Sequence, residues 1–262
     1  MTDSRAFDLL RVRVHPDRAA VGAAAADDAA DAIDRAVAGR GSARVVFACA
    51  PSQSEMLAAL RARPVDWARV TAFHMDEYAG LSAGHPASFR HYLHEHLLRR
   101  VPVREFHGIA GEAGDLAAEG RRYAELLQAA PIDLVCLGIG ENGHLAFNDP
   151  PVADFNDPLA VKVVELDEPC RRQQVNDGCF PSIAEVPRRA LTLTIPMLLA
   201  GRALVVTVPG PRKAAAVRSA LIGPVATACP ASILRTHRSA ALHLDRDAAA
   251  GVAATTLPSF QG

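Results

Sequence analysis

The amino-acid sequence predicts an α/β fold: a doubly wound, mostly parallel sheet with helices on both faces, in three Rossmann-like layers. First, short runs rich in β-branched residues alternate with helical stretches along the chain. Second, several of these runs are apolar throughout, as expected for strands buried on both faces of a parallel sheet. Third, half of the 262 residues are hydrophobic, which is enough for one large core. Because α/β folds of about 250 residues often form one unit, we expect a single domain over residues 1–262.

The expected elements begin with an alanine-rich helix at residues 17–38. Charged residues interrupt this stretch, which predicts an amphipathic surface helix rather than a membrane span. The expected strands are the apolar or β-branched runs at residues 44–49, 70–74, 132–137, 161–166, 190–194, 203–208 and 240–244. The further helices lie between these strands, at residues 52–62, 86–100, 115–130 and 212–221. The Asp- and Pro-rich segment 148–160 is predicted to be a loop.

The overall composition excludes several classes of protein. The formal net charge is -1, so a broad nucleic-acid-binding surface, which needs clustered Lys and Arg, is not expected. Residues 1–10 lack the basic and apolar regions of a signal peptide, and no run is long and uncharged enough to span a membrane. The five cysteines form no CxxC pair, and Cys49 and Cys136 lie in apolar runs, as free thiols do in a reducing compartment. We therefore expect a cytoplasmic protein without nucleic-acid or membrane partners.

Polar or glycine-rich segments follow four of the expected strands. They are residues 50–54 (APSQS), 76–78 (DEY), 138–144 (GIGENGH) and 209–213 (PGPRK). In open α/β sheets, ligands bind beyond the carboxyl ends of the strands. The sequence therefore predicts one site at this edge of the sheet.

Two adjacent carboxylates, Asp76 and Glu77, closely follow an apolar strand. A carboxylate that is partly shielded from water at a strand end can serve as a general base with a raised pKa. The alternative is a helix cap or a solvated loop residue, and for an isolated Asp-Glu pair that alternative is the more common one.

The glycine-rich segment 138–144 ends on His144. Glycine lets the backbone approach a ligand closely, and an imidazole on such a loop can shuttle protons near neutral pH. A plain turn with a surface histidine is the alternative. Asn148 and Asp149 follow closely, and the resulting group of acid, amide and imidazole favours a functional site.

Two expected helices begin at the same sheet edge with residues suited to an anion. Lys213 follows the Pro- and Gly-containing turn at 209–212, and Ser52 and Ser54 begin the helix after the first strand. The free N–H groups at a helix start attract anions, and a lysine adds a point charge. Each serine taken alone favours an N-cap, but two such helix starts at one edge favour a phosphate site.

A metal site is not predicted. His91, His94 and His96 lie in one expected helix, but His96 points away from the other two and there is no HExxH pattern. The aromatic residues Trp67, Tyr92 and Tyr123 are interpreted as core or helix-face residues, because the aromatic content is too low for a stacking platform.

These motifs together resemble one enzyme family. Residues 73–78 (FHMDEY) and 85–89 (HPASF) resemble the MDEY…HPxSY signature of glucosamine-6-phosphate deaminases, and residues 137–148 (LGIGENGHLAFN) look like their GxGxxGHxxFN loop. Three further segments are similar to the family's VPxxALT strand start, its phosphate-binding loop and its late SxLxxH segment: residues 186–192, 210–213 and 232–237. The resemblance runs over about residues 45–245, and it implies the three-layer fold of the sugar-phosphate isomerase type.

The resemblance implies an isomerisation of an aminosugar phosphate, such as glucosamine 6-phosphate, to a ketose phosphate with release of ammonia. Formally this is a hydrolysis of a C–N bond. Asp76 would carry the proton between C2 and C1. His144 would assist ring opening, held by a neighbouring carboxylate, for which Glu141 and Asp149 are the candidates. Positioned acid–base groups supply this chemistry, so no metal or organic cofactor is expected.

The resemblance also implies how a small sugar phosphate would be bound. Lys213 and the segment of Ser52, Gln53 and Ser54 would hold the phosphate. The other expected substrate-binding residues are Glu77, Gly140, Asn142, Gly143 and Arg171.

The chain departs from the family pattern at three places, which makes it a divergent member. Asn142 stands where many deaminases have Asp, and an amide cannot stabilise an imidazolium by charge. The segment 50–54 replaces a glycine-rich TGGTP-like turn and contains no glycine. The Arg that the family places before a Phe pair falls near Asp177 or Gly178, with Arg171 or Arg172 as possible replacements.

Two other functions stay open at this point. The related 6-phosphogluconolactonases share the fold but usually continue as GHTASLFP after the glycine loop, whereas residues 143–148 (GHLAFN) have the deaminase form. A non-catalytic sugar-phosphate sensor is the second alternative, but residues 1–43 predict only one long helix and no helix-turn-helix. A homo-oligomer is possible, although residues 249–262 predict no helix that would support the assembly of relatives.

Overall fold

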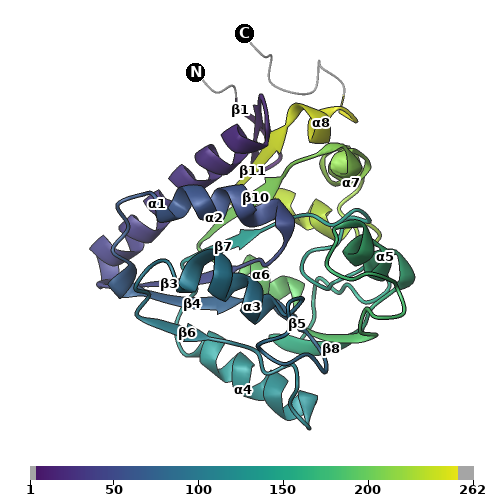
Figure 1. Cartoon of the computed structure of the whole chain (residues 1–262). Helices are drawn as coiled ribbons and strands as arrows, with labels where there is room; N and C mark the ends of the chain where they lie inside the picture. Colours follow the sequence, from purple (N-terminus) through teal and green to yellow (C-terminus); the bar gives the residue numbers. More distant parts are fainter. Residues whose placement is uncertain (1–3, 253–262) are drawn as a thin grey trace.

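The computed structural model describes residues 4–252 and contains one large sheet and one small sheet (Figure 1). In the described part of the chain the large sheet has the order β1-β2-β11-β10-β7-β3-β4-β6. Its strands are β1 (Ser4–Phe7), β2 (Leu10–His15), β3 (Ala43–Phe47), β4 (Val70–His74), β6 (Glu105–His107), β7 (Leu134–Leu137), β10 (Ala203–Val208) and β11 (Ala240–Asp245). The pairs are parallel except for the β1–β2 hairpin. This order, with crossovers on both sides of β7, confirms the doubly wound α/β class.

The small sheet has the order β5-β9-β8 and lies at one side of the molecule together with helix α5 (Figure 1). It contains β5 (Asp76–Tyr78), β8 (Val161–Glu165) and β9 (Arg189–Leu193), and both pairs are antiparallel. The predicted strands at 161–166 and 190–194 therefore exist but belong to this second sheet. Apolar periodicity reports burial, and it does not report which strand is the partner.

Helices cover both faces of the large sheet. On one face are α1 (Arg18–Arg40), α2 (Ser54–Arg61) and α3 (Phe89–Leu93), and on the other are α4 (Leu116–Gln128), α6 (Ile195–Leu199) and α7 (Ala214–Ile222). The helices α5 (Glu168–Asn176) and α8 (Arg246–Ala249) complete the set in the described residues. No helix among residues 4–252 has the length and apolarity needed to cross a bilayer.

The core consists of one apolar cluster on each face of the large sheet. Val135 and Leu137 of β7 belong to the cluster under α4, α6 and α7, whereas Leu134 and Cys136 of the same strand belong to the cluster under α1, α2 and α3. Successive side chains of a strand point to opposite faces, so a strand between two helical layers must be apolar at every position. This explains the continuous apolar runs in the sequence.

Several elements differ from the sequence prediction. The one helix predicted within residues 1–43 is present as α1, but the prediction missed the β1–β2 hairpin that precedes it. The helix expected at 86–100 begins at Phe89 and continues from His94 to Leu98 as a π-helix. The elements β5, β6, α5, α6 and α8 were not predicted, since they are short or polar and carry little periodic signal. Most of the segment 249–262 lies outside the described residues.

Candidate active site

A cavity of about 530 Å³ lies at the carboxyl ends of the central strands. Segments that follow β3, β4, β7 and β10 line it, as the sequence predicted for the edge of the sheet. Of the predicted site residues, six line this cavity: Ser52, Gln53, Asp76, Gly140, His144 and Lys213.

The imidazole of His144 lies against the backbone of its own loop. A Cβ built on Gly140 would lie 2.2 to 2.4 Å from ring atoms of His144, so no side chain fits there. Gly143 has a φ of 86° and places Cys229 against its Cα, which also requires glycine. Ala146, which lines the cavity, holds a φ of 51° that non-glycine residues rarely adopt. The glycines of the motif thus serve to fix the histidine ring in place.

Asp149 holds His144 from behind. The Nδ1 atom of His144 lies 2.9 Å from Oδ1 of Asp149, and the two residues are 8% and 1% exposed. Burial by itself would raise the pKa of Asp149, but the contacts with His144, Asn142 and Cys170 outweigh it and hold the pKa below its ordinary value. The carboxylate is therefore ionised and can stabilise an imidazolium at His144.

Asn142 supports Asp149 rather than the imidazole ring. Its Nδ2 donates to Oδ1 of Asp149 at 2.9 Å, and its Oδ1 accepts from the backbone N–H of His144 at 3.0 Å. A carboxylate at position 142 would face Asp149 as a like charge, whereas the amide donates to it. The departure of Asn142 from the family pattern is thus compatible with an ionised Asp149.

Asp76 faces the cavity from β5. Its side chain is 6% exposed, and burial raises its pKa well above the ordinary value, with the nearby charge of Glu77 as a second cause. A carboxylate in this situation takes up a proton readily.

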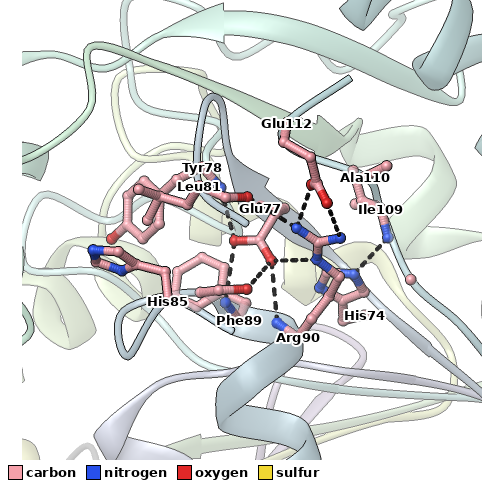
Figure 2. A network of polar contacts seen from close by, with 12 residues as sticks. His74, Glu77, Tyr78, Leu81, His85, Phe89, Arg90, Ile109, Ala110 and Glu112 are labelled. Carbon is pink, nitrogen blue, oxygen red and sulfur yellow. Dashed lines mark hydrogen bonds and ion pairs between the residues drawn. The ribbon is translucent and has the colours of Figure 1, made fainter. Parts of the chain in front are cut away.

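Glu77, the next residue of β5, is not among the residues that line the cavity, and its carboxylate lies within a network of donors (Figure 2). Its Oε1 accepts from the N–H groups of Tyr78 and Phe89, at 3.0 and 3.1 Å. Its Oε2 accepts from Oγ of Ser88 at 2.7 Å and from both the N–H and Nε of Arg90. Both oxygens are occupied, so the prediction of Glu77 as a substrate ligand does not agree with the structure.

Lys213 is the buried cation of the cavity. Lys213 is 8% exposed. Burial lowers the pKa of its ammonium group, although the charges of Asp177 and Glu141 oppose this change. The turn before it is fixed from the neighbouring strand, since the N–H of Gly210 donates to both carboxylate oxygens of Asp245. Lys213 therefore has a fixed backbone and an ammonium group at the cavity wall.

The segment that contains Ser52 and Gln53 also lines the cavity. Gln53 is fully buried, and its Oε1 accepts from Oγ1 of Thr207 at 2.8 Å while its Nε2 donates to Oγ of Ser52 at 3.2 Å. The Tyr92 hydroxyl donates to the carbonyl of Ala50 at 2.8 Å. These contacts fix a loop that contains no glycine.

Two arginines at the cavity were not found from the sequence. Arg18, at the first turn of α1, pairs with Glu55 at 2.7 Å. Arg212 pairs with Asp177 of the segment after α5 at 2.5 Å and with Glu141 at 3.3 Å. Their position beside a strand end was the only feature of the sequence that pointed to a role in the site. This feature is weak, because a charged residue at a helix start is usually solvated.

The remaining predicted residues do not line the cavity. Ser54 shares a hydrogen bond with Tyr92, and Gly143 packs on Cys229. Glu141 pairs with Arg212 and Asn142 with Asp149. The guanidinium of Arg171 donates to the backbone carbonyls of Ile183 and Val186, and Arg172 pairs with Glu168, so neither replaces the missing family arginine.

Helix α5 and the residue after it close one side of the cavity. The residues that contribute are Gln173, Gln174, Asn176 and Asp177. The Oε1 of Gln173 accepts from the N–H of Glu141 at 2.8 Å, which joins α5 to the glycine loop. The wall is rich in amides where the family pattern has an arginine.

Comparison with known proteins agrees with this architecture. Residues 16–243 match the family described as glucosamine-6-phosphate isomerases/6-phosphogluconolactonase. The chain belongs to this family. It is 31% identical to a glucosamine-6-phosphate deaminase of Lactobacillus delbrueckii subsp. bulgaricus over 92% of this chain and 98% of that protein. It is 37% identical to the glucosamine-6-phosphate deaminase of Exiguobacterium sibiricum over 71% of each.

Solved structures show the same fold. A monomeric glucosamine-6-phosphate deaminase superposes with a TM-score of 0.83 at 31% identity, covering 92% of this chain and 99% of that chain. A 6-phosphogluconolactonase from Shewanella baltica reaches a TM-score of 0.73 at 20% identity, covering 94% and 100%. The second likeness concerns the fold alone, and the relatives with deaminase activity are those similar in sequence.

Proposed function

We propose that this chain is an isomerising deaminase that converts an aminosugar phosphate, glucosamine 6-phosphate or a close relative, into a ketose phosphate and ammonia. The observation that supports this most directly is the arrangement of one cavity. Asp76, with its raised pKa, and His144, backed by Asp149, line the same cavity as the buried ammonium of Lys213. The identity of the deaminase relatives points to the same reaction.

The ring-opening step is assigned to His144. The imidazole moves the proton of the C1 hydroxyl to the ring oxygen, and it is cationic in passing. Asp149, held ionised by Asn142, stabilises that cation and fixes the orientation of the ring.

The isomerisation step is assigned to Asp76. It removes the proton from C2 and returns it to C1, while a proton passes from the amino group to the C1 carbonyl oxygen. The C=O double bond at C1 is thereby replaced by a C=N double bond at C2, which gives an imine. Water then adds to the resulting imine and ammonia leaves, which makes the overall reaction a hydrolysis of the C–N bond. A carboxylate whose pKa is raised by burial is suited to take and return a proton within one turnover.

The phosphate is assigned to the end of the cavity that Lys213, Arg212, Arg18 and Ser52 line. The short 3-10 helices Pro51–Gln53 and Pro211–Lys213 position these side chains and lead into α2 and α7. Arg212 takes the place of the arginine that the family has near position 177, because Asp177 holds it there by an ion pair.

An ammonia-release assay tests the proposal directly. Glucosamine 6-phosphate and galactosamine 6-phosphate are supplied separately, and ketose phosphate is measured in the same samples. Equal amounts of ammonia and ketose phosphate support the proposal. Absence of ammonia with both sugars, together with hydrolysis of 6-phosphogluconolactone, would replace it by the lactonase, and tight binding without turnover would replace it by the sensor.

The setting of the enzyme is part of the same proposal. We treat residues 1–262 as one domain acting in the cytoplasm, and a homo-oligomer is compatible with it. Size-exclusion chromatography with light scattering measures the oligomeric state, for which the monomeric deaminase relative is the reference.

A further inference from the structure

Behind the wall of the cavity, three chemically different ligands converge on one point. The imidazole of His144, the carboxylate of Asp149 and the thiol of Cys170 each offer an atom, and these atoms all lie within 4.8 Å of one another. The three residues are 8%, 1% and 1% exposed. They come from the glycine loop and from the first turn of α5, so the cluster is formed only when these two segments pack together.

One carboxylate oxygen of Asp149 lacks a hydrogen-bond partner among the described residues. Oδ2 of Asp149 is buried and accepts no hydrogen bond in the described residues, although Oδ1 is well occupied. An ionised carboxylate with an unoccupied buried oxygen is expensive to maintain, and a cation is the usual way to complete it.

The local charge also favours a cation. Asp167, the N-cap of α5, accepts from the N–H of Cys170 at 2.8 Å, which places a second carboxylate beside the cluster. Two carboxylates at one point favour a divalent cation there.

We propose that His144, Asp149 and Cys170 form an inhibitory binding site for Zn²⁺. One nitrogen, one oxygen and one sulfur ligand suit zinc, which accepts all three atom types and binds tetrahedrally. Of the three ligands only His144 lines the cavity. The fourth coordination position of the ion therefore lies on the cavity side, and a water molecule occupies it. The ion reaches the cluster by the same path.

Binding of the ion releases one proton from the Cys170 thiol to solvent. The hydrogen of His144 moves from Nδ1 to Nε2, so the imidazole contributes a neutral ligand and the carboxylate loses no proton. The metal occupies the nitrogen and the carboxylate that ring opening requires. Turnover therefore stops while substrate binding at Lys213 is retained, and the inhibition is non-competitive with the sugar phosphate.

The test uses the full chain, Co²⁺ as a spectroscopic substitute for Zn²⁺, and the variants Cys170→Ala and Cys179→Ala. Cys179 is the matched control, because it is a free thiol on the segment just after α5 and is not part of the cluster. Cys170→Ser is added because it retains a polar atom of similar size, and circular dichroism confirms that each variant is folded. Inhibition by Zn²⁺ is expressed relative to the metal-free activity of the same variant.

We expect wild type and Cys179→Ala to bind one Co²⁺ per chain with a sulfur-to-metal charge-transfer absorption that both Cys170 variants lack. The Zn²⁺ concentration for half inhibition should rise at least about tenfold in Cys170→Ala. Absence of the charge-transfer band in wild type, or equal inhibition of Cys170→Ala, would overturn the inference. The Co²⁺ spectrum needs no turnover, so this result is independent of whether the proposed deaminase reaction is correct.

Discussion

Each face of strand β5 carries a carboxyl group, and the surroundings of the two carboxyl groups are opposite in kind. Asp76 lines the cavity, whereas Glu77, the next residue, is buried and does not line it, because successive side chains of a strand alternate. Burial raises the pKa of both carboxyls. At Glu77, hydrogen bonds from Ser88, Arg90 and Phe89 oppose that rise. At Asp76 the second cause is the charge of Glu77, which adds to it.

The difference shows what separates the proposed catalytic carboxylate from a structural one. Every oxygen of Glu77 is committed to donors of the loop and helix that follow β5, so its charge serves to fix the backbone (Figure 2). Among residues 4–252 no donor forms a hydrogen bond to the Asp76 carboxyl, so nothing opposes the rise of its pKa, as expected for a group that takes up a proton. Glu77 fixes the strand that carries Asp76.

The largest effect is expected from Asp76→Asn. An amide cannot take a proton from C2, so kcat should fall by about 10²–10⁴-fold with little change in KM. Steady-state kinetics measure this, and circular dichroism shows that the variant is folded. Turnover within a few-fold of wild type would remove Asp76 from the mechanism.

Glu77→Ala should act on stability first. It leaves several buried donors unpaired, and the loss of one partner of a buried ion pair costs about 3–5 kcal/mol. Urea denaturation measures the free energy of unfolding. Glu112→Ala is the matched control, because Glu112 also pairs with Arg90 but has a side chain that is 46% exposed, and it should cost less than about 1 kcal/mol. Equal losses in the two variants would contradict the structural role of Glu77.

Gly140→Ala tests whether close packing against Gly140 holds the His144 ring in place, as hydrogen bonds hold Glu77 in place. The added methyl group would lie 2.2 Å from the His144 ring, so the ring must move. A displacement of about 1 Å can reduce kcat by about 10²-fold. Gly39→Ala is the control, since nothing lies within 4 Å of its added Cβ, and it should leave kcat unchanged. An active Gly140→Ala enzyme would show that the ring is not fixed by this contact.

The smallest effect concerns the pH dependence of stability. The pKa of Asp76 is raised above 3.8, so between that value and the raised one the folded state retains a proton that the unfolded state has released. The free energy of unfolding of wild type therefore falls as pH rises through this range. Asp76→Asn lacks this dependence and should become more stable than wild type as pH increases. Urea denaturation from about pH 4 to about pH 9 measures the difference, and a constant difference would contradict the raised pKa.

Much of the candidate site was predictable because it depends on local sequence. The strand ends that carry Asp76, His144 and Lys213 follow apolar runs, and parallel strands bring their carboxyl ends to one edge. Gly140 was predictable for a related reason, since a close approach of side chain to backbone requires glycine. The fold class followed from strands that are apolar at every position.

The sequence by itself thus determined the α/β class, the edge of the sheet that holds the candidate site, and three residues that line its cavity. Only the tertiary structure decided that Glu77 faces inward, that Arg212 pairs with Asp177, and that Cys170 lies beside Asp149. The physical reason is the range of the interactions. Periodicity and turn chemistry act over a few neighbouring residues, whereas the pairing of Arg212 with Asp177 joins segments 35 residues apart. The partner of a buried charge is fixed only when the packed chain removes water from both groups.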